Sequence, residues 1–112
     1  MATVAEKSMN FSVRIVRLYH YLVDRKKEFV ISKQLLRAGT SIGANIAEAE
    51  SSFSKRDFLA KMYIAFKECS ETNYRLRLLF QTGYLTTREF NSINDDCSEI
   101  RHMLSAITKT TR

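Results

Sequence analysis

The segment 55–81 carries an unbroken seven-residue repeat of apolar and small side chains. Its positions advance in alternating steps of three and four, which keeps them on one side of a helix and is typical of left-handed helix packing. The repeat consists of Phe58, Met62, Ala65, Cys69, Thr72, Leu76 and Leu79. A helix with such a stripe has to bury it against other helices, so the repeat predicts a helical bundle.

Three further segments show helical spacing, and little interrupts them. The 112 residues include no proline and three glycines, a composition that disfavours folds rich in strands or loops. We expect helices over about residues 8–26, 32–49, 55–81 and 86–108 of one domain, residues 1–112, with loose ends at 1–7 and 109–112. Four amphipathic helices with short connections are antiparallel neighbours, which predicts an all-α, up-down-up-down antiparallel four-helix bundle.

Several helix ends are marked by local signals. Thr86 and Glu89 have the spacing of a capping box that opens the last helix. Gly83 suits the left-handed backbone position that ends the helix before it. The apolar residues 29–31 allow two interpretations: the first turn of the second helix, or an entry segment that precedes a cap at Ser32.

The predicted second helix contains two glycines one turn apart, each of which costs about 1 kcal/mol relative to alanine. A helix gains from such residues when a neighbour packs closely, so we expect tight packing here, within the chain or across a subunit boundary. The alternative is that the helix ends at the first glycine.

A polar stripe runs beside these two glycines, and we interpret it as a hydrogen-bonded oligomer interface. The other interpretation is that the stripe is exposed to solvent and that its asparagine forms hydrogen bonds with backbone groups. These signature positions are Arg37, Gly39, Ser41, Gly43, Asn45 and Glu48.

Two cysteines lie on predicted core faces and at similar distances from the turn at residues 83–85. Cys69 precedes it by 14 residues and Cys97 follows it by 12, so an antiparallel hairpin places them at nearly the same height. We expect two buried, reduced cysteines that pack as small hydrophobes, and a disulfide is the less favoured alternative.

The chain is basic, with a formal net charge of +6, and its surplus lies mainly on the first and third helices. Such a surface suits a polyanion, because arginine binds phosphate through two parallel hydrogen bonds. The alternative is that these groups form ion pairs, and we expect the tyrosines of these helices to lie at the core boundary. The candidate nucleic-acid-binding residues are Arg14, Arg17, Lys61, Lys67, Arg75 and Arg77.

No set of catalytic or metal-binding residues emerges from the sequence. His20 and His102 fall on different helices without neighbouring ligands, and the zinc-protease, phosphate-loop and nucleophile-elbow motifs are absent. We therefore expect no enzyme activity, metal or cofactor. Since no apolar run approaches the length of a membrane span and no signal segment follows Met1, we expect a cytoplasmic protein without a membrane partner.

The stretch 35–49, Leu-Leu-Arg-Ala-Gly-Thr-Ser-Ile-Gly-Ala-Asn-Ile-Ala-Glu-Ala, resembles the signature of the four-helix-bundle family named for proteins encoded in 23S ribosomal RNA intervening sequences. Segments 14–16 and 21–22 are similar to its first helix, 58–62 and 68–79 to its third, and 82–85 to its last turn. The resemblance implies a bundle that assembles into a ring, often a pentamer, and a nucleic-acid-binding role without catalytic residues. Related accessory proteins of diversity-generating retroelements share this fold and act beside a reverse transcriptase.

Charge and resemblance together favour one function. We expect a non-enzymatic, basic, homo-oligomeric protein, a pentamer by resemblance, that binds RNA or DNA. The alternative is an oligomeric scaffold or accessory subunit that serves a partner protein and does not bind nucleic acid itself. Salt-sensitive binding to nucleic acid distinguishes the first hypothesis from the second.

Overall fold

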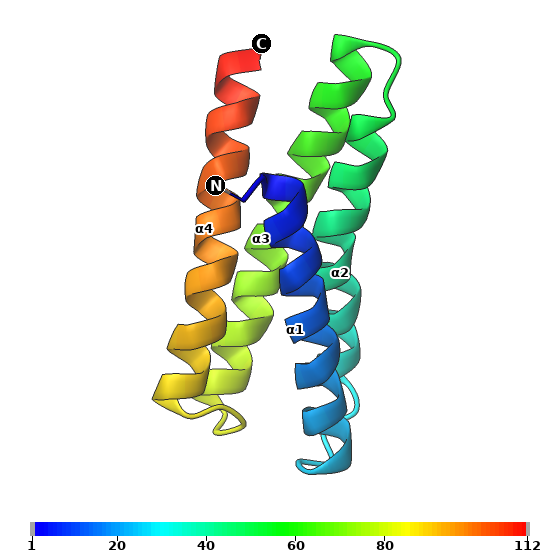
Figure 1. The fold of residues 1–112 in the computed structure, drawn as a ribbon. Coiled ribbons are helices and arrows are strands. Elements are labelled where there is room, and N and C mark those ends of the chain that lie inside the picture. The colour runs from blue at the N-terminus through cyan, green and yellow to red at the C-terminus, as the bar shows by residue number, and fades with distance from the viewer. Residues whose placement is uncertain (1, 112) are drawn as a thin grey trace.

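The structure, a computed structural model, describes residues 2–111, and the side chains of residues 2–110. The helices are α1 (Val4–Asp24), α2 (Ile31–Glu50), α3 (Lys55–Gln81) and α4 (Thr87–Thr111). Successive helices run in opposite directions (Figure 1), so the predicted up-down-up-down bundle is confirmed. Within the described part of the chain, no helix is both long and apolar enough to cross a membrane.

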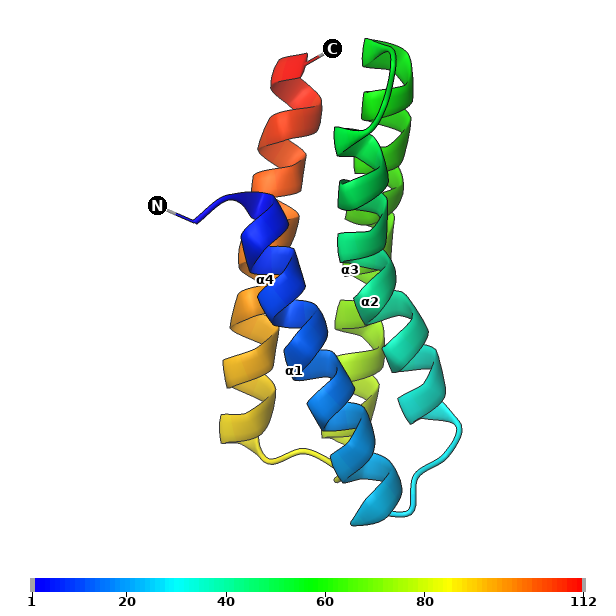
Figure 2. The ribbon, with the colours of Figure 1, turned by 45° about the vertical axis from the view of Figure 1, so that its right-hand side comes forward.

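The four helices form a bundle about 44 Å long and 22 by 21 Å across. Each helix packs against the one that follows it, and α4 returns to α1 along the least extensive contact. The helices α1 and α3 occupy diagonal corners and do not pack on each other. Towards the end where α4 begins, α1 and α4 diverge (Figure 2).

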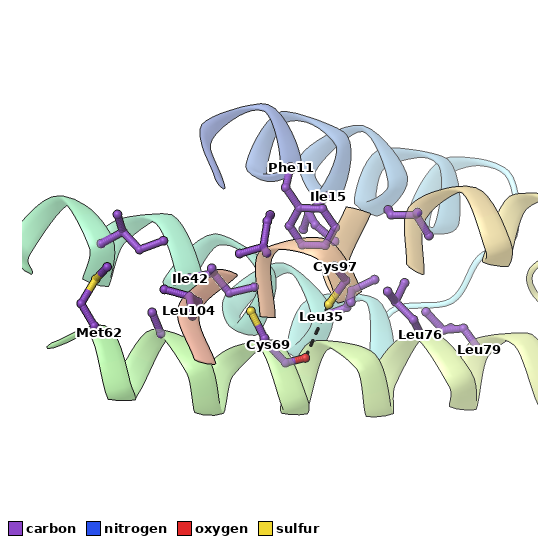
Figure 3. Close-up of a cluster of buried hydrophobic side chains, with 14 of the residues drawn as sticks. Phe11, Ile15, Leu35, Ile42, Met62, Cys69, Leu76, Leu79, Cys97 and Leu104 are labelled. Carbon is purple, nitrogen blue, oxygen red and sulfur yellow. Dashed lines mark hydrogen bonds between the residues drawn. The ribbon is translucent and has the colours of Figure 1, made fainter. Parts of the chain in front are cut away.

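The core is a column of aliphatic, aromatic and sulfur-containing side chains along the bundle axis (Figure 3). Six of the seven repeat positions on α3 are buried, and Phe58 is half-buried beside them. The other helices contribute Phe11, Ile15, Leu22, Leu35, Ile42, Ile46, Ile93, Cys97, Ile100 and Leu104. Burial of this surface supplies most of the driving force for folding.

The two glycines of α2 face α1 within the same chain. A Cβ placed on Gly39 would lie 2.8 Å from Cγ1 of Ile15, and one on Gly43 would lie 3.3 Å from Oγ of Ser8 and of Ser12. Their place is therefore taken by side chains of α1. The helix continues through both positions, so the alternative of a helix end at Gly39 is wrong.

The helix α1 begins earlier than predicted. Thr3 and Glu6 form a capping box, in which the Glu6 backbone N–H donates to Thr3 Oγ1 (3.1 Å) and the Thr3 backbone N–H donates to Glu6 Oε1 (3.2 Å). Polar residues at this spacing satisfy the free N–H groups of a helix start without any apolar periodicity. The expectation of a loose segment is therefore wrong for residues 3–7, while Met1 lies outside the described residues.

The start of α2 follows neither interpretation completely. The helix begins at Ile31, and the carboxylate of Glu28 accepts hydrogen bonds from the backbone N–H groups of Val30 (3.2 Å), Ile31 (3.1 Å) and Ser32 (2.6 Å). Burial raises the pKa of Glu28, but these backbone donors outweigh it, so that the pKa is lowered overall. A buried glutamate thus performs the capping that Ser32 was expected to provide.

The connection between α3 and α4 agrees with its sequence signals. Gly83 has φ +88°, and the N–H groups of Gly83 and Tyr84 donate to the carbonyls of Phe80 and Leu79, the pattern that closes many helices at a glycine. The predicted capping box between Thr86 and Glu89 is present, with distances of 2.8 and 3.1 Å. At its other end α4 continues to Thr111, so a loose end from residue 109 is wrong, and Arg112 lies outside the described residues.

Cys69 and Cys97 are free, buried and at the same height, as predicted. The thiol of Cys97 donates to the backbone carbonyl of Cys69 over 3.5 Å (dashed line in Figure 3). The neighbouring side chain of Cys97 and burial both raise the pKa of the Cys69 thiol, which keeps it protonated.

Candidate nucleic-acid interface

Two tyrosines lie exposed on the outer face of α3. Tyr63 is 55% exposed and Tyr74 51% exposed, which contradicts their expected place at the core boundary. Tyr74 follows Tyr63 by eleven residues. Eleven residues make about three helical turns, so both rings point to the same side of α3 at a separation of about 16 Å along its axis. Exposed aromatic rings in a row on one helix face offer successive platforms on which bases can stack.

Each ring has cationic side chains beside it. Lys67 Nζ lies 5.9 Å from the ring centre of Tyr63, and the guanidinium carbons of Arg75 and Arg77 lie 5.3 and 5.9 Å from that of Tyr74. Such contacts contribute about 0.5–1 kcal/mol at exposed sites and hold the cations near the rings. Stacking groups and phosphate-binding groups therefore occur together on this face.

A polar groove of about 410 Å³ runs between α3 and α4 next to Tyr74. Its lining combines two guanidinium groups, two hydroxyl groups and an amide with one thiol, and it includes no carboxylate. The lining residues are Ser70, Asn73, Arg77, Cys97, Ser98 and Arg101. A groove with this set of donors and without an acid favours an anion such as phosphate.

Arg101 is held in place at this groove from two sides. Its guanidinium carbon lies 4.8 Å from the ring centre of Phe66, and its Nε donates to Oγ of Ser70 over 3.2 Å. A guanidinium has five N–H donors, so one bond leaves the others for a ligand. Nearby, Asn73 Nδ2 donates to Asn94 Oδ1 over 2.6 Å and fastens α3 to α4.

Arg101 is not among the residues predicted from the sequence. One signal was available: Ser70 precedes the 83–85 turn by 13 residues and Ser98 follows it by 13, so an antiparallel hairpin places these two serines at the same height. Arg101 follows Ser98 by almost one turn and so returns to the same groove. We refer to Tyr63, Lys67, Tyr74, Arg75, Arg77 and Arg101 as the α3–α4 basic face.

The other predicted basic residues lie elsewhere. Arg14 pairs with Asp96 on α4 (2.6 Å) and also donates to the carbonyl and hydroxyl of Ser92. Lys61 pairs with Glu48 on α2 (3.0 Å). Arg17 lines a groove between α1 and α4. Because α1 and α3 lie on diagonal corners, one chain does not join the six predicted residues into a single surface.

The polar stripe of α2 makes its described contacts within the chain. Arg37 reaches Glu68 (3.8 Å) and Glu71 (3.5 Å) on α3, and Glu48 reaches Lys61. Ser41 donates to the carbonyl of Arg37 (2.6 Å), and Asn45 donates to that of Ser41 (2.8 Å). The stripe therefore ties α2 to α3 and to its own backbone, and its role as an oligomer interface stays a prediction.

Glu68 and Glu71 form a coupled carboxyl pair beside Arg37. Burial and the neighbouring Glu71 raise the pKa of Glu68, while the hydrogen bond with Glu68 lowers the pKa of Glu71. Among the described residues, Oε1 of Glu68 is buried without a hydrogen-bond partner.

Histidine, cysteine and acidic side chains do not gather into a group of three that could hold a metal ion anywhere in the described part of the chain. His20 lies on α1, with its ring 5.7 Å from that of Tyr19, and His102 lies exposed on α4. The interface described above is therefore a set of stacking and charged groups.

Comparison with known proteins places the chain in a family. A family model described as 23S rRNA-intervening sequence protein matches residues 2–106. A crystal structure of a protein of unknown function from the S23 ribosomal protein family of Bacteroides thetaiotaomicron is 54% identical, with a TM-score of 0.95 over 96% of this chain and 99% of that one. A search of curated proteins found no match. The chain therefore belongs to the 23S rRNA-intervening sequence protein family, as the resemblance predicted.

Proposed function

We propose that this protein is a non-enzymatic nucleic-acid-binding protein whose α3–α4 basic face binds single-stranded RNA or DNA. The observation that carries the proposal is the pairing of two exposed tyrosines with cations beside a groove that no carboxylate lines. Proteins that bind single strands without sequence readout combine aromatic platforms with a positively charged track in this way.

Each group has a separate role in the proposal. The rings of Tyr63 and Tyr74 stack on unpaired bases, while Arg77 and Arg101 hold a backbone phosphate between α3 and α4. Lys67 and Arg75 add positive charge along the strand, partly offset by the carboxyl groups of Glu68 and Glu71 beside them. Because a base-paired duplex does not present free base faces, the stacking contribution is confined to single strands.

The test measures binding of a labelled single-stranded RNA by fluorescence anisotropy over a range of salt concentrations. Replacing both Arg77 and Arg101 with serine removes two phosphate contacts, so the slope of log affinity against log salt becomes shallower by about 1.4. Tyr74→Ala weakens single-strand binding by about tenfold through lost stacking and leaves duplex binding unchanged. The matched control is the double variant Arg25→Ser and Lys33→Ser, which also removes two exposed positive charges but none from the α3–α4 basic face, and its affinity should equal that of wild type.

Two outcomes contradict the proposal. If wild-type protein does not bind RNA or DNA at low salt, the alternative of an accessory subunit for a partner protein becomes the better account. If the Arg25→Ser and Lys33→Ser double variant weakens binding as much as the variant of Arg77 and Arg101, net charge and not the α3–α4 basic face determines affinity.

We also propose that the chain works as a homo-oligomer, with a pentamer as the expectation from the resemblance. Support comes from α1, where Met9 (65% exposed), Val13 (41%) and Val16 (38%) form an apolar stripe on the outer side. An isolated helix face of this kind favours contact with another protein surface. Light scattering of native protein tests it: a single-chain mass for wild type contradicts it, and Val13→Glu is expected to lower the mass of the assembly.

A further inference from the structure

A second groove, of about 460 Å³, lies between α1 and α4. The backbones of these two helices diverge towards this end of the bundle (Figure 2). Its floor is apolar: Leu85 and Ile93 are 5% and 4% exposed, and Leu18 packs beside them. Binding sites for small molecules are typically hollows of about 300–1,000 Å³ with an apolar lining and a few convergent polar groups. The groove falls within this range.

The rim of this groove is cationic. Arg14 and Arg17 reach it from successive turns of α1, and Arg88 reaches it from the first turn of α4. Arg14 is held by Asp96 and Ser92. In the part of the chain that the structure describes, the side chains of Arg17 and Arg88 form no ion pair or hydrogen bond, so both are free to bind an anion.

The acidic group at this groove is already engaged. Glu89 lines it, but its Oε1 accepts the backbone N–H of Thr86 over 2.8 Å as part of the helix cap. That bond directs the carboxylate towards the start of α4, away from the guanidinium groups of α1. The two free guanidinium groups therefore dominate the charge that a ligand meets.

The length of the groove indicates the size of the occupant. From Arg14 to Tyr21 it extends along eight residues of α1, a rise of about 10 Å. A helix of ordinary length is longer than about 10 Å, and its diameter alone is about 10–12 Å, so it does not fit within the groove. A small molecule with one apolar body and one anionic end fits the groove better.

We propose that the α1–α4 groove binds a small aromatic anion, such as a nucleoside monophosphate. The planar body packs against the ring of Tyr21, which also lines the groove, and on Leu18, Leu85 and Ile93. The phosphate bridges Arg17 and Arg88 across the two helices. This site is independent of the α3–α4 basic face, since it lies on α1 and the opposite side of α4. Occupation would fasten α1 to α4 along their least extensive contact.

The test titrates isotope-labelled full-length protein with AMP and follows amide chemical shifts by NMR. The expected result is a saturable shift of the resonances of Leu18, Leu85 and Ile93. Adenosine, which lacks the anion, and inorganic phosphate, which lacks the apolar body, should each bind at least about tenfold more weakly than AMP.

Variants assign the anion to the two arginines. The double substitution Arg17→Ser and Arg88→Ser should raise the dissociation constant for AMP by about tenfold or more, whereas Arg25→Ser, an exposed arginine outside the groove, should not change it. Unchanged thermal midpoints establish that the variants fold. A further titration uses laurate, an aliphatic anion. If laurate binds as tightly as AMP, the proposed preference for an aromatic body is wrong.

Three results overturn the site as a whole. These are the absence of groove shifts at about 5 mM AMP, equal binding of phosphate alone, and shifts confined to the α3–α4 basic face. The last result would show that AMP reports the proposed nucleic-acid surface, so failure of this site leaves that proposal standing.

Discussion

Replacing Gly39 with alanine tests the close approach of α1 and α2. The new Cβ would lie 2.8, 2.9 and 3.0 Å from Cγ1, Cγ2 and Cδ1 of Ile15. Carbon atoms pack best at about 3.5–4.0 Å, so the new Cβ and the Ile15 side chain have to move apart by about 0.7 Å. Ile15 is fully buried, and its two γ carbons branch from the β carbon. Rotating the side chain therefore does not clear the space, and the helices have to move apart.

The magnitude follows from two opposing effects. Overpacking a dense core costs about 1–3 kcal/mol. Alanine gains about 1 kcal/mol over glycine in a helix interior. The clash at Gly39 lies at the upper end of the range because three carbons are involved, so Gly39→Ala should destabilise the protein by about 1–2 kcal/mol.

Thermal unfolding followed by circular dichroism at one protein concentration measures this effect. For a chain of this length the midpoint should fall by about 4–8 °C. Gly43→Ala is the matched control, because the atoms nearest to its Cβ would be the hydroxyl oxygens of Ser8 and Ser12 at 3.3 Å and the carbonyl oxygen of Ser8 at 3.5 Å. A small rotation about χ1 moves a serine oxygen by the few tenths of an ångström needed, so this variant should change the midpoint by less than about 4 °C.

A double variant isolates the contact itself. Ile15→Ala alone should cost about 2–5 kcal/mol through the cavity it leaves. In that background Gly39→Ala should become stabilising by about 1 kcal/mol, because the clash has gone and the helix propensity remains. If Gly39→Ala raises the midpoint of the otherwise unchanged protein, the close approach described here is incorrect.

Three further perturbations probe other contacts by thermal unfolding. Glu68→Gln should raise the midpoint at pH 7, because the pKa of Glu68 is raised and its ionisation therefore destabilises the folded protein. Below pH 4.5 the carboxyl group is protonated in both states, so the gain in midpoint should vanish there. A gain that does not change with pH would contradict this explanation. Glu28→Gln should cost about 1–2 kcal/mol at pH 7 by weakening the cap of α2. Since the pKa of Glu28 is lowered, that cost should shrink as the pH falls below 4.5, and a pH-independent cost would count against the cap. Gly83→Ala should cost about 1–2 kcal/mol from backbone strain alone, as its Cβ meets nothing within 4 Å, and Gly83→Asn should cost less.

Apolar periodicity was sufficient to predict the bundle. The repeat on α3 specifies one buried stripe, and the bounds predicted for that helix, 55–81, agree with the structure. The glycines of α2 are informative for a related reason, since their cost within a helix requires a close neighbour. Periodicity does not register a capping box built from polar residues, which is why the start of α1 at Val4 was predicted four residues too late.

The candidate interface was harder to predict because it depends on how each helix is rotated about its axis. A tyrosine suits both a core boundary and an exposed face, so Tyr63 and Tyr74 gave no decisive signal. The partner of Arg14 is Asp96, 82 residues away, and only the packing of α1 against α4 brings them together. Arg101 acquires its role from Phe66 and Ser70 on the adjacent helix.

Photo-crosslinking tests the central claim most directly, because it identifies the residues that touch nucleic acid. Wild-type protein is mixed with thiouridine-substituted single-stranded RNA at low salt, irradiated, digested and analysed by mass spectrometry. The account predicts adducts on α3 at Tyr63 or Tyr74, and their loss when Arg77 and Arg101 are both replaced by serine. Adducts that map only to α1 or α2, or protein that forms none under conditions where it binds the RNA, would contradict it.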